Sequence, residues 1–195
     1  MTQEDKELLL KDLCARLPYG VVINTGDKDV KLDRQHQGIG ILYPEDCSDE
    51  FNKRNNNASF YIVISGCYYG EKIKPYLRPM SSMTEEEAKE LLFVRLASKY
   101  GESCAYIKNF IKLNEVSFQK KPPYEGSIAV WFSFENKIYD TPQTREYSKC
   151  EYLGQINDIS LAEIDWLNAH HFDYRGLIDK SLAVEVTEEN NPYKF

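Results

Sequence analysis

The segment at residues 160–177 holds the densest group of side chains that could do chemistry. Two of the three histidines in the chain lie there, as the adjacent pair His170 and His171. Asp173 and Arg175 follow shortly after them. Histidines and carboxylates serve as general acids and bases, and an arginine can clamp an anion. One hypothesis is therefore a hydrolase acting on phosphodiesters, with these four side chains as its candidate catalytic residues.

The spacing of the two histidines argues against a metal site. Adjacent residues on a helix point about 100° apart, so His170 and His171 cannot share one metal ion while both are helical. The i, i+4 histidine pair that is typical of helical metal sites is absent. If the helix ends near His170, the side chains that follow it can still converge around the turn. The sequence predicts no metal site and no cofactor.

The same segment also has a structural interpretation, which we favour. A histidine near a helix C-terminus interacts with the last carbonyl groups. Asp173 and Arg175 can form a local ion pair, and Gly176 can supply a left-handed cap. The segment would then be a structural clasp, a stretch whose contacts hold neighbouring elements together. Trp166 and Tyr174 are its candidate residues for binding a partner, because both rings combine an apolar body with a polar group.

Three amphipathic helices are predicted, and each begins with a capping box, in which a Ser or Thr and an acidic residue three positions later satisfy each other's backbone N–H groups. The first begins at Thr2 and ends before Pro18. The second begins at Thr84 and ends at Gly101, and the third begins at Ser160.

The first helix shows its amphipathic pattern most clearly. A leucine stripe recurs at helical spacing and should dock on a sheet: Leu9, Leu10, Leu13 and Leu17. The charged residues between them are expected on the solvent side: Lys6, Lys11, Asp12 and Arg16. In the second helix the expected apolar face consists of Ala88, Leu91, Leu92, Leu96 and Tyr100.

Short β-segments fill the regions between these helices. In the first half they are expected near residues 21–23, 30–32, 38–43, 59–64 and 67–73, with an exposed loop at 44–59. In the second half they are expected at 106–107, 110–113, 116–118, 127–134, 137–139 and 151–153, with a hairpin turn at Glu135 and Asn136 and a polar stretch at 141–149.

These elements predict an α+β protein made of two small antiparallel β-rich modules framed by three amphipathic helices. The expected division is at residues 1–80 and 81–195. An extended connector from Pro75 to Pro79 joins the two parts, which can also form one compact unit. The tail at 187–195 is charged and has little to bury.

Composition restricts the class of function. The formal charge is -7, from 24 basic and 31 acidic residues, which disfavours non-specific binding to nucleic acid. The five cysteines are far apart and form no C-x-x-C pair, as expected for free thiols in a reducing compartment. The sequence shows no signal peptide and no apolar run of about 20 residues. We therefore expect a cytoplasmic protein that does not enter a membrane.

Three stretches resemble one group of proteins. They are residues 4–21, residues 74–87 (KPYLRPMSSMTEEE) and residues 166–178 (WLNAHHFDYRGLI). They are similar to blocks in small uncharacterised proteins of Bacteroides-type gut bacteria, their prophages and mobile elements. The resemblance implies a phage-associated protein with a shared frame, and it implies no activity. The chain departs from that group near Ala183, where a proline- and glycine-containing ending is expected.

Two functions of different classes follow. The first is a non-enzymatic binding protein of phage or mobile-element origin, which acts on a host protein or sequesters a small ligand. It rests on the lack of a catalytic motif, the 14 tyrosines and the unmatched segments at 23–73 and 88–156. The alternative is the hydrolase centred on the His-His-x-Asp-Tyr-Arg segment. The sequence leaves the oligomeric state open.

Overall fold

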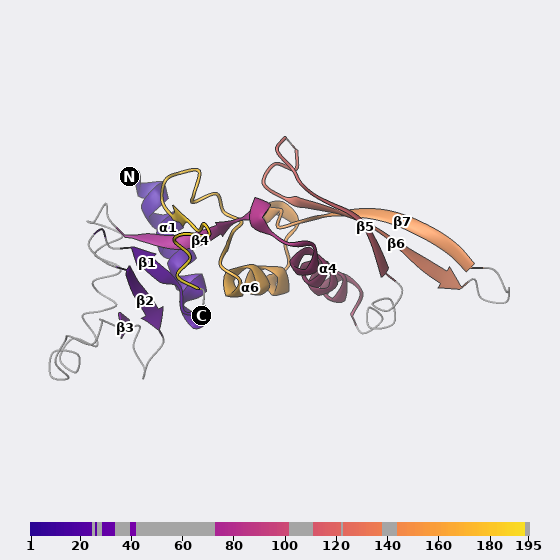
Figure 1. Ribbon diagram of the computed structural model, residues 1–195, viewed down its shortest axis with the longest axis horizontal. Helices are drawn as coiled ribbons and strands as arrows, with labels where there is room; N and C mark the ends of the chain where they lie inside the picture. The colour runs from indigo at the N-terminus through magenta and orange to yellow at the C-terminus, as the bar shows by residue number, and fades with distance from the viewer. Residues whose placement is uncertain are drawn as a thin grey trace. The chain divides into compact units, whose positions relative to one another are not determined.

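A computed structural model describes residues 1–24, 26, 29–33, 40–41, 73–101, 111–121, 123–137 and 144–193. The predicted strands at 59–64 and 106–107, the loop at 44–59 and most of the predicted strands at 38–43 and 67–73 lie outside these residues. Within them the chain forms three α-helices and two sheets rich in antiparallel strands (Figure 1). This arrangement confirms the predicted α+β class with small β-modules.

The helices are α1 (Gln3–Arg16), α4 (Glu85–Tyr100) and α6 (Leu161–Ala169), with short 3-10 turns η1 (Leu17–Tyr19), η2 (Met80–Ser82) and η3 (Ile156–Asp158). The strands are β1 (Val22–Asn24), β2 (Asp29–Asp33), β3 (Gly40–Ile41), β4 (Lys74–Pro79), β5 (Ile111–Phe118), β6 (Ile128–Lys137), β7 (Thr144–Leu153), β8 (Phe172–Asp173) and β9 (Val184–Glu185).

The chain divides into two compact units. The first consists of Met1–Arg78 with Asn168–Phe195, and the second is Pro79–Leu167. The sequence division at residue 80 places residues 168–195 with the second half. In the structure they return to the first unit, where β8 and β9 both pair with β4.

The first unit is one sheet with α1 packed on it. The strand order is β3-β2-β1-β4-β8, and β9 pairs with β4 in parallel. The expected connector is therefore strand β4, in the interior of this sheet. Its core joins side chains of α1 to side chains of the strands and of the C-terminal segment: Leu9, Leu13, Leu17, Val21, Ile23, Ile73, Leu77, Leu177, Leu182 and Ala183.

Two charged residues of α1 are buried, contrary to the expected solvent side. Asp12 and Arg16 are both 0% exposed. Two faces of the helix are covered. The leucine stripe lies on the sheet, and segment 172–175 covers Asp12 and Arg16. Asp12 and Arg16 can be buried because they lie one turn apart and bind each other, with Nε 2.7 Å from Oδ2.

The second unit is the three-stranded antiparallel sheet β5-β6-β7 with α4 on one face. Alternate residues of β6 point to α4 and are buried: Ile128, Val130 and Phe132. The hairpin turn predicted at Glu135 and Asn136 is wrong, since both residues lie within β6 and pair with β7. The stretch lacks the Asn-Gly that favours a two-residue turn. Strand β7 also occupies most of the stretch that the sequence indicated as polar.

A buried ion cluster holds α4 to its neighbours in the second unit. Arg95 is 2% exposed, and its guanidinium donates to Glu151 and Glu163, both at 2.9 Å, and to Asp158. The expected apolar face of α4 is thus correct for its buried alanine and leucines. It omits Arg95 and wrongly includes Tyr100, which is 47% exposed.

All three predicted capping boxes are confirmed. Asp5, Glu87 and Glu163 each accept the N–H of the cap residue, at 2.9, 2.9 and 3.0 Å. The hydroxyl groups of Thr2, Thr84 and Ser160 accept the return bonds. None of the helices in the described ranges is long and apolar enough to cross a membrane.

Candidate functional site

The predicted site begins where α6 ends. The helix stops at Ala169, and the N–H of His171 donates to the carbonyl of Asn168 at 3.1 Å. His171 then takes a left-handed backbone conformation, with φ of 57°, which turns the chain into β8. The helix therefore ends just before His170. The chain reverses because one non-glycine residue adopts a conformation that most side chains disfavour.

His171 is buried and electrically neutral. Its ring stacks on Tyr193, with centroids 3.9 Å apart and planes 7° from parallel. Desolvation, together with the positive charge of Arg16, lowers the pKa of His171 to about 3. Its Nδ1 atom has no hydrogen-bond partner among the residues that the structure describes. A histidine that is 8% exposed and uncharged over the whole physiological range is poorly suited to proton exchange with a substrate in solution.

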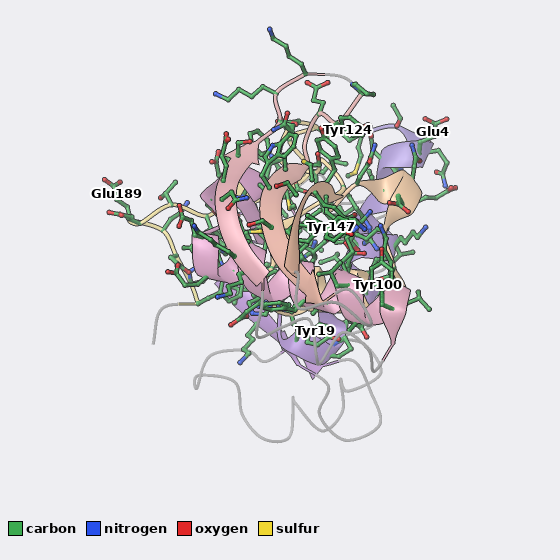
Figure 2. All side chains as sticks on the ribbon, turned by 90° about the vertical axis from the view of Figure 1, so that its right-hand side faces the viewer. Glu4, Tyr19, Tyr100, Tyr124, Tyr147 and Glu189 are labelled. Carbon is green, nitrogen blue, oxygen red and sulfur yellow. The ribbon has the colours of Figure 1, made fainter. Side chains whose placement is uncertain are left out.

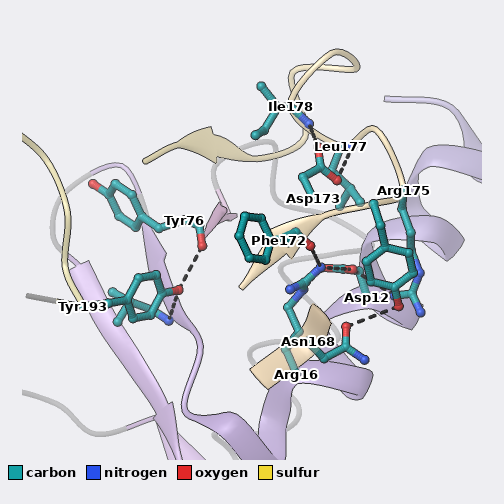
Figure 3. Close-up of polar contacts among 12 residues, drawn as sticks. Asp12, Arg16, Tyr76, Asn168, Phe172, Asp173, Arg175, Leu177, Ile178 and Tyr193 are labelled. Atoms are coloured by element: carbon teal, nitrogen blue, oxygen red, sulfur yellow. Dashed lines mark hydrogen bonds and ion pairs between the residues drawn. The ribbon is translucent and has the colours of Figure 1, made fainter. Parts of the chain in front are cut away.

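Tyr193 is held from both sides. Its hydroxyl accepts from the N–H of Val22 at 3.2 Å and donates to the carbonyl of Tyr76 at 2.9 Å (Figure 3). Burial raises the pKa of Tyr193 to about 12. The tail that the sequence describes as having little to bury is thus bound to β1 and β4 through one tyrosine.

The carboxylate of Asp173 accepts hydrogen bonds from backbone N–H groups. Its two carboxylate oxygens accept from the N–H groups of Leu177, at 3.0 Å, and Ile178, at 2.7 Å. Burial raises the pKa of Asp173, and these two hydrogen bonds work in the opposite direction. The carboxylate orders the turn that follows β8.

Arg175 binds Asp12 of α1, with Nη1 2.8 Å from Oδ1. The local ion pair predicted between Asp173 and Arg175 is therefore wrong, because each finds a partner elsewhere. Asp12 also holds Arg16, whose Nη2 donates to the carbonyl of Phe172 at 2.8 Å (Figure 3). These contacts hold segment 172–175 against Asp12 and Arg16 of α1.

The two candidate binding aromatics are in different situations. Tyr174 is 7% exposed, its hydroxyl donates to Oδ1 of Asn168 at 3.3 Å, and its ring lies 4.7 Å from the guanidinium carbon of Arg175. Trp166 lies on α6 and is half-buried. Tyr174 therefore contributes to the interior of the first unit and offers little surface to a partner.

The predicted site residues are close in sequence but do not share an open site. His171, Asp173 and Arg175 each contact a different element, and His170 is half-buried beside them. Across the part of the chain that the structure describes, no group of three or more His, Cys, Asp and Glu side chains is arranged to hold a metal ion. The geometry is that of a clasp between α1, β4 and the C-terminal segment.

The structure also shows a surface that sequence reasoning missed. On the sheet face opposite α4, three cross-strand rungs lie side by side: Lys112–Ser133–Ser148, Glu115–Trp131–Cys150 and Ser117–Ala129–Tyr152. We call these nine residues the Trp131 face. Trp131 is 45% exposed at its centre. The alternation around Trp131 in the apolar run 127–134 could have indicated it, since the neighbours at i±2 are small.

One residue of this face, Tyr152, is stacked on a second tyrosine. Its partner is Tyr124, from the turn between β5 and β6 (Figure 2), and the ring centroids are 3.6 Å apart with planes 7° from parallel. Burial raises the pKa of the Cys150 thiol, which keeps it protonated and uncharged. With one lysine and one glutamate, the Trp131 face has no net charge.

A small pocket lies in the first unit, away from the predicted site residues. Its volume is about 270 Å³, and it is lined by residues of α1, the start of β4 and the segment before β9. None of His170, His171, Asp173 and Arg175 lines it.

Comparisons with known proteins give no further guide. No family model, curated protein or solved structure matches the chain.

Proposed function

We propose that the protein is a non-enzymatic binding protein that contacts a partner protein through the Trp131 face. The observation that carries the proposal is the indole of Trp131, 45% exposed on the sheet face opposite α4. Tryptophan and tyrosine contribute most to the free energy of binding at the centres of protein interfaces.

The surroundings of Trp131 favour a protein partner. Ala129 and Ser133, its small neighbours at i±2 on the same face, are 2% and 3% exposed, so Trp131 is the exposed residue of the three. The stacked Tyr124 and Tyr152 give a rigid aromatic pair. The lack of net charge makes a phosphate backbone a poor occupant. The face of an antiparallel sheet also encloses a small ligand poorly, because small-ligand sites are clefts or cavities.

We infer the origin in a phage or mobile element, with a host protein as partner in the cytoplasm, from the resemblance of the three blocks. Most of the resembling residues belong to the first unit, where they include most of α1 and β4 and all of β8. Trp131 lies in the second unit, within the segment at 88–156 that resembles nothing. A shared frame that carries a different contact surface suits a binding protein.

The hydrolase alternative receives no support from the geometry. General acid–base catalysis needs a titratable group within hydrogen-bond reach of the substrate. His171 and Asp173 are both 8% exposed, and the oxygens of Asp173 are bound to backbone N–H groups. We therefore propose no catalytic residue.

Site-specific cross-linking tests the proposal. A photoreactive phenylalanine analogue is placed at residue 131, 147 or 161, and the protein is expressed in a Bacteroides-type host. Tyr147 and Leu161 are matched controls in the same unit, exposed at 41% and 83%, and neither belongs to the Trp131 face. We expect one discrete protein adduct from position 131. No adduct, or the same adducts from all three positions, contradicts the proposal.

The adduct is then tested with purified components. Trp131→Ala should weaken binding of the identified protein by about 30-fold or more, which is the loss of about 2 kcal/mol typical of a central aromatic side chain. Leu161→Ala should leave the dissociation constant unchanged. Equal binding by wild type and Trp131→Ala would refute the proposed surface.

A further inference from the structure

Apolar, cationic and hydroxyl-bearing residues together line the pocket of the first unit. Its volume is about 270 Å³. The lining includes three buried apolar residues, Leu9, Ile73 and Leu182. It also includes the polar residues Lys74, Lys180 and Ser181. This composition matches a ligand with an apolar body and an anionic group.

Ser181 has an unusual backbone in this pocket. The N–H of Leu182 donates to the carbonyl of Leu177 at 2.8 Å, and the N–H of Ser181 donates to that of Ile178 at 2.9 Å. These two bonds define a Schellman motif, whose left-handed position is usually a glycine. Ser181 occupies it with φ of 57°. Strained residues of this kind cluster at ligand sites, and serine brings a hydroxyl group that glycine would not supply.

The charges at the pocket favour an anion. Asp5 is the acidic residue among those that line it. Its Oδ2 accepts the N–H of Thr2 at 2.9 Å, and its Oδ1 lies 4.0 Å from Nζ of Lys180. The hydrogen bonds from Thr2 lower the pKa of Asp5, so it is ionised at neutral pH. Two lysines against one carboxylate leave a net positive charge at the pocket, which favours an anionic group.

We propose that this pocket binds a small amphipathic anion, an acidic head group on a short aliphatic chain. The head group interacts with Lys74, Lys180 and the hydroxyl of Ser181, and the chain lies against the buried leucines and Ile73. A volume just below the range for drug-sized ligands limits the chain to a short one. The site is in the first unit and does not depend on the proposed function of the Trp131 face.

Methyl NMR of the full-length, untagged protein tests the site. The probes are octanoate and octyl phosphate, with octylamine and octanol as controls for charge. We expect saturable shifts of the methyl groups of Leu9, Ile73 and Leu182 with one or both anions, with a dissociation constant of about 1 mM or lower. The affinity should fall as salt is added, because the head-group contacts are exposed. The comparison of carboxylate with phosphate identifies the preferred head group.

Three variants sharpen the result. Lys180→Ala should weaken binding by about tenfold, while Lys11→Ala, an exposed lysine of α1 outside the pocket, should not change it. Ser181→Gly should raise the melting temperature by relieving the left-handed serine and should also weaken binding several-fold. A residue that serves only the turn would show the first effect without the second.

The proposal is overturned if neither anion shifts the three methyl groups, or if octylamine shifts them equally. It is also overturned if Lys180→Ala and Ser181→Gly both bind as wild type does. Because Ser181→Gly is expected to fold, weaker binding by this variant cannot be attributed to misfolding.

Discussion

Asp12 forms ion pairs with two arginines, Arg16 and Arg175. Arg16 is fully buried, so removing the carboxylate of Asp12 would leave the guanidinium charge of Arg16 buried without its anion. We expect Asp12→Ala to lower the free energy of unfolding by about 3–5 kcal/mol, as is usual for one broken partner of a buried ion pair. Urea denaturation measures this. Asp179→Ala, at an exposed position, should change it by about 0.5 kcal/mol or less. A loss below about 1 kcal/mol for Asp12→Ala would show that Arg16 finds another partner.

His171 should make stability depend on pH. Its pKa is about 3 in the folded protein and about 6.5 in the unfolded chain. As the pH falls below 6.5, the unfolded chain binds the proton first, so stability decreases by up to about 1.4 kcal/mol per pH unit until the pH approaches 3.

The variant His171→Asn isolates this effect, because asparagine tolerates a left-handed backbone and does not titrate. Burial raises the pKa of Asp173, whose contribution has the opposite sign: it is present at low pH and is lost as the pH rises through the folded value. The informative quantity is thus the difference between wild type and variant. A stability curve measured between pH 4 and 7 should be flatter for His171→Asn. Parallel curves would show that His171 titrates normally.

At this scale the sequence indicates which residues are unusual better than it indicates their environments. It singles out the segment with His171, Asp173 and Arg175, and the contacts fit a structural role for it, but the predicted partner of Asp173 and Arg175 is wrong. It places Asp12 and Arg16 on the solvent side, because an amphipathic pattern assumes that charged residues face water. Their burial depends on a segment more than 150 residues away, which no local pattern contains.

Elements are predictable where their signals are local. The capping boxes that begin at Thr2, Thr84 and Ser160 are confirmed, because each involves only four residues. Strand β7 was largely missed, since its residues Thr144–Leu153 are mainly polar and charged. A strand whose alternate side chains reach solvent gives a weak hydrophobic signal, and its pairing with β6 provides what the pattern lacks.

Arg95 links three elements, so its loss should destabilise the second unit. Arg95→Met would leave Glu163, which is 1% exposed, without its cation. We expect a loss of about 3–5 kcal/mol. Lys99→Met is the matched control: Lys99 lies one turn later on α4 and also binds Glu151 at 2.9 Å, but its side chain is 36% exposed. That variant should lose about 1 kcal/mol or less.

Tryptophan fluorescence during urea denaturation can follow this unit, because both tryptophans of the chain, Trp131 and Trp166, belong to it. If Arg95→Met and Lys99→Met lower the unfolding midpoint equally, the cluster contributes no more than a surface ion pair.

On the scale of the whole molecule, the division of the chain depends on contacts between distant residues. Residues 168–193 belong with the first unit because β8 and β9 pair with β4, and because the hydroxyl of Tyr193 binds β1 and β4. Each of these strands has two residues. Elements this short carry no periodic pattern, so the sequence could predict the fold class but not the return of the chain.

The two units each contain their own buried ion cluster, centred on Asp12 in the first and on Arg95 in the second. If each unit is a separate cooperative element, a lost charge should loosen only the unit that contains it. Hydrogen exchange followed by mass spectrometry can measure this for the full-length protein. Asp12→Ala should speed exchange in α1, β1 and β4 and leave β5–β7 unchanged, and Arg95→Met should do the reverse.

Because the two variants are expected to cost a similar free energy, a general loss of stability would speed exchange everywhere for both. That outcome would show that the chain unfolds as one element and that the two units are divisions of geometry alone.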